Sequence, residues 1–97
     1  MVIIAIDYGD KRIGVAKSDP LGFLAHGVTT IEWNRDINKP LDVLEEIVDE
    51  HKAGRIVVGL PLNMDDSEGE KAIKVRAFAS MLEERCKIPV ILFDERL

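Results

Sequence analysis

The chain has 97 residues, of which 46% are hydrophobic and 32% charged, a balance typical of one soluble globular domain spanning residues 1–97. No apolar run approaches the ~20 residues of a membrane-spanning helix, and no signal peptide is recognisable, so we expect a cytoplasmic protein with no membrane contact. The formal net charge of −5 argues against a generic basic nucleic-acid binder. It leaves room for a nuclease, because carboxylates that hold cations add to the same negative total.

The first fourteen residues predict a strand and a hairpin. Residues 2–6 are all apolar, so we expect a strand covered on both faces, with Asp7 at its carboxyl end. Residues 8–11 break the pattern, and residues 12–16 resume it with Ile13 and Val15 on one face. This arrangement indicates an antiparallel hairpin that puts Asp7 at the edge of a sheet, beside glycine backbone that a ligand can approach closely.

The middle of the chain predicts a third strand over residues 28–33 and then a helix. Asn38 is expected to cap this helix, Pro40 lies just inside its start, and Gly54 follows its end in a left-handed cap. Its apolar stripe has helical spacing and comprises Leu41, Leu44, Ile47 and Val48.

The rest of the chain predicts two strands, at residues 55–60 and 90–93, joined by a second helix. Ser67 and Glu70 have the spacing of a capping box at the start of this helix. Cys86, the only cysteine, lies near its end and is expected to pack rather than react, and no disulfide can form within the chain. The apolar side chains between them follow helical intervals: Ala72, Val75, Phe78, Ala79, Leu82 and Cys86.

The resulting order predicts an α/β fold with a mixed five-stranded sheet, three antiparallel strands followed by parallel crossover units. With the first strand central, the carboxyl ends of the parallel strands bring Asp7 and the pair Asp94 and Glu95 to one edge, where open α/β sheets place their sites. Carboxylates at neighbouring strand ends suit Mg²⁺ or Mn²⁺, and metal-assisted phosphodiester hydrolysis would follow. We predict Asp7 and Glu95 as catalytic metal ligands. Asp94 is the weaker third candidate, because successive strand side chains point to opposite faces.

Four sequence blocks carry a resemblance to a known family. They are DYGDKRIGVA at residues 7–16, VGLPLN at 58–63, SEGE at 67–70 and FDERL at 93–97, and together they closely resemble the YqgF/RuvX family over essentially the whole chain. The resemblance implies a ribonuclease H-like fold and a metal-dependent nuclease. It links the chain to 5′-end maturation of precursor 16S ribosomal RNA and, in some relatives, to Holliday junction resolution. Asp7 matches the first-strand acid of the family, and Glu95 the acid of its Asp-Glu-Arg block.

The chain departs from the family at its carboxyl end. Family members continue through a further helix that supplies another acid, whereas this sequence ends at Leu97, so we expect the third carboxylate to be missing and one sheet face to be less covered. Exposed apolar surface on that face predicts self-association, most simply as a homodimer.

The basic residues near the expected site have two readings. Lys11, Arg12 and Arg96 could hold substrate phosphates of structured RNA or of branched DNA, or could be solvated turn charges paired with Asp10 or Asp94. Four further cations of the second helix, interleaved with glutamates, are expected to form an ordinary solvated face. They are Lys71, Lys74, Arg76 and Arg85.

Two other functions fit parts of the sequence. The Asp-x-Gly turn at Asp7 also occurs in phosphotransferases of the actin and sugar-kinase type, although these pair two such domains around a nucleotide. A non-catalytic nucleic-acid or ribosome-assembly module would keep the fold without cleavage. Cleavage assays with Mn²⁺ or Mg²⁺ distinguish the non-catalytic module from the nuclease. A nucleotide-dependent thermal shift would support the phosphotransferase.

Overall fold

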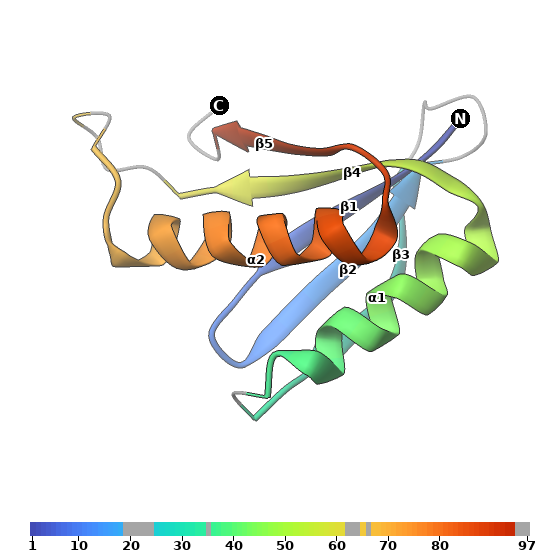
Figure 1. Cartoon of the computed structure of the whole chain (residues 1–97), viewed down its shortest axis with the longest axis horizontal. Coiled ribbons are helices and arrows are strands. Elements are labelled where there is room, and N and C mark those ends of the chain that lie inside the picture. Colours follow the sequence, from blue (N-terminus) through green and yellow to red (C-terminus); the bar gives the residue numbers. More distant parts are fainter. Residues whose placement is uncertain (19–24, 35, 62–64, 66, 95–97) are drawn as a thin grey trace.

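The computed structural model describes residues 1–18, 25–34, 36–61, 65 and 67–94. Within these ranges the sequence-predicted order of strands and helices is confirmed (Figure 1). The elements are β1 (Val2–Tyr8), β2 (Arg12–Ser18), β3 (Ala25–Glu32), α1 (Asn38–His51), β4 (Ala53–Leu60), α2 (Glu70–Cys86) and β5 (Val90–Asp94).

The strands form one mixed sheet in the order β3-β2-β1-β4-β5, with β1 in the centre. β1 pairs antiparallel with β2 and parallel with β4, while β4 pairs parallel with β5. The three parallel strands therefore run toward one edge of the sheet, at the left of Figure 1, where the hairpin between β1 and β2 also turns. This is the topology that the sequence predicted, and it makes the carboxyl edge of β1, β4 and β5 the place to look for a site.

Both helices lie on one face of the sheet (Figure 1). Side chains of β1 alternate accordingly: Ile4, Ile6 and Tyr8 are buried in the core, whereas Ile3 and Ala5 are half-buried and Asp7 is exposed. The expectation that this strand is covered on both faces is therefore wrong for the described residues. Apolar side chains on the second face are shielded only partly, by neighbouring strands rather than by a helix.

The apolar stripes of both helices were predicted correctly, but their ends were not. The buried residues of α1 include Leu41, Leu44, Ile47 and Val48, and those of α2 are Ala72, Val75, Phe78, Ala79 and Leu82. At the carboxyl end of α1, Lys52 takes the left-handed conformation with φ 52°, and Gly54 instead belongs to β4. An αL lysine is strained relative to glycine, but its N–H reaches the carbonyl oxygens of Asp49 and Val48, which offsets that cost.

The predicted side-chain caps are absent from the described residues at both helix starts. Asn38 is already the first residue of α1, and its N–H donates to Asp36 Oδ1 at 3.1 Å. Before α2, the N-cap residue is Gly69, without a side-chain cap, whereas the capping box predicted Ser67 in that position; the Ser67 hydroxyl donates to Asp65 Oδ1. In each case an aspartate accepts from the backbone N–H two residues further along the chain, as in an Asx turn.

Arg85 joins the two helices. Its Nη2 donates to Asp42 Oδ1, and its Nε donates to Glu45 Oε2 at 3.1 Å, so one side chain of α2 bridges two carboxylates one turn apart on α1. The prediction that Arg85 is merely solvated is therefore wrong, although the bridge remains partly open to water.

Candidate active site

Asp7 lies within β1, one residue before the strand ends, on the sheet face that the two helices leave uncovered. Its neighbour across the hairpin is Gly14, and a Cβ added at Gly14 would lie 3.8 Å from Asp7 Cβ. Glycine at this position therefore leaves open space beside the carboxylate. The exposed position and the open flank are what a ligand needs to approach an acid closely.

A second glycine borders Asp7 from the other side. Ile6 is in register with Val58 in the parallel pair, and the next residue of β4, Gly59, is in register with Phe93 of β5. Ile6, Asp7, Gly59 and Phe93 line one depression of about 380 Å³. The structure thus places Asp7 in a hollow across three parallel strands at their carboxyl edge, as the topology predicted.

The depression continues as a shallow groove along the uncovered face. Its floor consists of small residues from three strands, and Phe93 borders it together with Val28 of β3. The small residues are Ala5, Gly14, Ala16 and Gly27. Among the described residues this floor carries only short side chains, so Asp7 is accessible from the groove as well as from the edge of the sheet.

Of the predicted partners of Asp7, the structure describes only Asp94. Asp94 is half-buried, as are Val90 and Leu92, while Ile91 and Phe93 between them are exposed. Strand alternation therefore assigns Asp94 to the face that α2 covers and Phe93 to the face of Asp7. Glu95 and Arg96 lie outside the described residues, so their predicted roles stay predictions.

The donor chemistry at Asp7 fits a hard divalent cation, because an exposed carboxylate supplies the oxygen ligands that Mg²⁺ and Mn²⁺ prefer. Within residues 1–18, 25–34, 36–61, 65 and 67–94, no three acidic, histidine or cysteine side chains are close enough to form a metal site.

The predicted basic residues Lys11 and Arg12 lie in and just after the hairpin turn. Gly9 donates to the carbonyl of Arg12 at 3.0 Å, and a Cβ on Gly9 would lie only 2.5 Å from that oxygen, so the turn requires glycine. Arg12 makes a long ion pair of 3.7 Å with Glu32, and both side chains are largely exposed. Such a pair holds the guanidinium weakly, so it remains available to a phosphate.

Trp33 stabilises this turn, a role that sequence reasoning missed. Its Nε1 donates to the Gly9 carbonyl at 3.2 Å, and its backbone N–H donates to the Lys11 carbonyl at 3.2 Å. The indole also contacts Tyr8, with ring centroids 5.6 Å apart. Burial, and to a smaller degree the charge of Asp10, raises the pKa of the Tyr8 hydroxyl, which therefore stays protonated at neutral pH.

Comparison with known proteins identifies the family. A profile described as "RuvX: Holliday junction resolvase" matches residues 1–97, the whole chain. The chain belongs to the RuvX family. A protein of Acetivibrio thermocellus named "Putative pre-16S rRNA nuclease" is 45% identical over 98 aligned positions, which cover all of this RuvX chain and 70% of that protein. A Moorella thermoacetica protein of the same name is 48% identical and is covered to 69%.

Solved structures confirm the ribonuclease H-like fold of this RuvX family member. Thermus thermophilus RuvC, solved with a Holliday junction, matches with a TM-score of 0.72 at 15% identity, over 99% of this chain and 66% of RuvC. A ROK family protein of Streptococcus pneumoniae, solved with sucrose, matches with a TM-score of 0.67 at 22% identity, over 98% of this chain and 35% of that protein. At such identities these likenesses establish the fold alone.

Proposed function

We propose that this RuvX family protein is a divalent-metal-dependent endonuclease that hydrolyses phosphodiester bonds in structured RNA, and that its substrate is the 5′ end of precursor 16S ribosomal RNA. The observation that carries the proposal is the placement of Asp7, exposed at the carboxyl edge of β1 with glycines on both sides. The names of its relatives in Acetivibrio and Moorella support the choice of RNA. A cytoplasmic location follows from this role, and none of the described helices is long and apolar enough to cross a bilayer.

In this proposal Asp7 and Glu95 hold Mg²⁺ or Mn²⁺, which when bound would activate water and stabilise the departing oxygen. Glu95 follows Phe93 by two positions in the sequence, the spacing at which strand side chains return to the same face. The Asp94 side chain points to the opposite face of the sheet from Phe93. We therefore propose that Asp94 contributes to metal binding less directly, at the edge of the sheet rather than beside Asp7. In this proposal the open space beside Gly14 admits the phosphate to the Asp7 carboxylate.

The positive charges that hold the nucleic-acid backbone are Lys11, Arg12 and Arg96 in this proposal. Lys11 lies in the turn that follows β1 and Arg12 is the first residue of β2, so phosphates next to the cleaved bond can reach both from Asp7. Arginine suits this task because its guanidinium can bind a phosphate through two parallel hydrogen bonds. Contacts of this kind position the substrate and do not read its sequence.

Cleavage of a 5′ precursor 16S RNA fragment with Mn²⁺ or Mg²⁺ tests the proposal. Asp7→Asn should reduce cleavage by about a hundredfold or more, because it removes a charged ligand. Asp49→Asn makes the same chemical change on an exposed position of α1 and should leave cleavage unchanged. Glu95→Gln should match Asp7→Asn, whereas Asp94→Asn should have the smaller effect.

Three outcomes would contradict parts of this assignment. Metal-dependent cutting that survives Asp7→Asn would locate the activity elsewhere. Equal losses in Asp94→Asn and Glu95→Gln would make Asp94 a direct ligand. Tight binding of the RNA without cutting would favour the non-catalytic ribosome-assembly module.

Branched DNA is the second candidate substrate, because the matching family profile is described as a Holliday junction resolvase. The same assay with a four-way DNA junction decides between the two. Faster cutting of the junction than of the precursor RNA would reverse our choice of substrate while leaving the role of Asp7 intact.

A further inference from the structure

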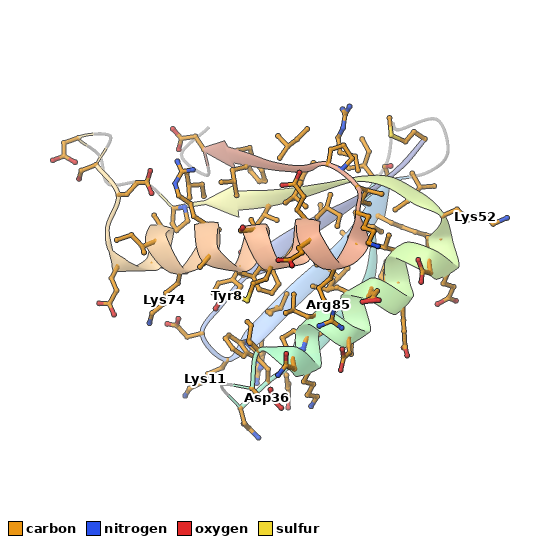
Figure 2. All side chains as sticks on the ribbon, in the orientation of Figure 1. Tyr8, Lys11, Asp36, Lys52, Lys74 and Arg85 are labelled. Carbon is orange, nitrogen blue, oxygen red and sulfur yellow. The ribbon has the colours of Figure 1, made fainter. Side chains whose placement is uncertain are left out.

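A depression of about 950 Å³ lies on the helix side of the sheet, just beyond the end of β1. The hairpin turn, the end of β3 and the first half of α2 enclose it, through Tyr8, Lys11, Trp33 and Lys74 among others. Figure 2 shows Tyr8, Lys11 and Lys74 gathered at this corner of the molecule. Tyr8 follows Asp7 directly but points to the opposite face, so the depression and the candidate active site lie on two sides of the same edge.

Positive charge outweighs negative charge in this depression, on a chain whose formal net charge is −5. Three cations and two acids line it: Lys11, Arg12 and Lys74 with Asp10 and Glu32. In the described part of the chain the Lys11 ammonium has no ion pair. Lys74 is 3.6 Å from Glu70, with side chains 56% and 86% exposed, so water screens this pair and a phosphate can replace the glutamate.

Two aromatic rings complete the lining. Trp33 is fixed by the hydrogen bond to Gly9 and by Tyr8, which in turn packs on buried Phe78 with centroids 4.8 Å apart. Trp33 nevertheless remains partly exposed. A rigid, accessible indole beside two lysines is the combination by which proteins bind unpaired nucleotides, stacking the base on the ring and pairing the phosphate with the cations.

We propose that this depression binds an unpaired nucleotide of the nucleic-acid substrate, with its phosphate between Lys11 and Lys74 and its base against Trp33. The proposal rests on the proposed nuclease function and extends it, since a strand that crosses the edge between the two faces reaches both Asp7 and Trp33. The substrate class is then a structured nucleic acid with a single-stranded flank beside the cleaved bond.

Trp33 is the only tryptophan in the chain, so its fluorescence reports on this depression directly. We expect a short oligouridylate, titrated without divalent metal, to quench the emission of the full chain in a saturable way. The double variant Lys11→Gln/Lys74→Gln should weaken binding about tenfold or more and lower the salt slope by about 0.7 for each lost phosphate contact. Lys71→Gln removes one positive charge from an exposed position of α2 that does not line the depression, and should bind as the wild type does, whereas Lys11→Gln or Lys74→Gln alone should already weaken binding.

Equal weakening in Lys71→Gln, or quenching by a blunt duplex as strong as by oligouridylate, would overturn the proposal. Its failure can be told apart from failure of the nuclease. Metal-dependent cleavage of the precursor fragment without any quenching contradicts nucleotide binding in the depression and leaves the nuclease function intact. Saturable quenching in a wild-type protein that cuts neither the precursor fragment nor the DNA junction supports nucleotide binding in the depression and contradicts the nuclease.

Discussion

Cys86 is the residue whose chemistry the fold alters most clearly. Burial, followed by the charges of Glu45 and Asp49, raises the pKa of its thiol from 9.0 to about 11, and the neighbouring Arg85 offsets this only partly. The thiolate is the reactive form, so a thiol with this pKa is poorly nucleophilic at neutral pH. The structural role that the sequence predicted for Cys86 agrees with this environment.

We expect iodoacetamide to alkylate Cys86 in the folded protein about a hundredfold more slowly than an unshifted thiol at pH 8. The folded pKa lies above the unfolded value, so the unfolded chain loses its proton first. The contribution of Cys86 to stability is therefore complete below about pH 9 and is lost as the pH rises toward about 11. Denaturant unfolding across this range measures it, and Cys86→Ala should lessen the decline. Rapid alkylation at neutral pH would contradict the shift.

Among the elements, the hairpin of β1 and β2 depends most on a single position. A Cβ on Gly9 would lie 2.5 Å from the Arg12 carbonyl oxygen, which cannot move without breaking the turn. We expect Gly9→Ala to lower the free energy of unfolding by about 1–3 kcal/mol. In the same hairpin, Gly14→Ala brings its Cβ only into ordinary contact with Asp7 and should change stability little. Urea unfolding of both variants is the measurement, and equal losses would show that the turn is not the cause.

The bodies of the helices and strands could be predicted from the sequence, but their ends could not. Leu44 and Phe78 belong to sets of apolar residues with helical spacing, and this spacing indicates both that the segment is a helix and which of its faces is buried. The left-handed cap at Lys52 depends instead on backbone hydrogen bonds, which a lysine side chain does not indicate in a sequence. Gly54, two residues later, was predicted as the cap because glycine is the residue most common in that conformation. In β1, an apolar run indicated burial without showing that one face lacks a covering helix.

For the molecule as a whole, chain topology predicted the edge at which Asp7 lies, because β1, β4 and β5 are parallel and adjacent. The depression around Trp33 could not be predicted in the same way. It combines residues from the hairpin, β3 and α2, and Lys74 looked like a solvated charge among glutamates until the position of α2 was known. Sites along one edge follow from strand order, whereas sites between layers need the packing of the helices.

The uncovered sheet face predicts the behaviour of the whole molecule in solution. Ile91 and Phe93 are 42% and 46% exposed on β5, an edge strand in the described sheet, and Phe93 also lines the groove beside Asp7. Exposed apolar surface at an unpaired edge favours pairing with a second copy of the chain. We therefore expect sedimentation equilibrium to show a concentration-dependent homodimer that Ile91→Ser weakens.

Ile73, 61% exposed on α2 at the opposite face, supplies the matched control, because Ile73→Ser should leave the dimer unchanged. A monomer at high concentration, or equal weakening by both substitutions, would show that this face does not mediate self-association.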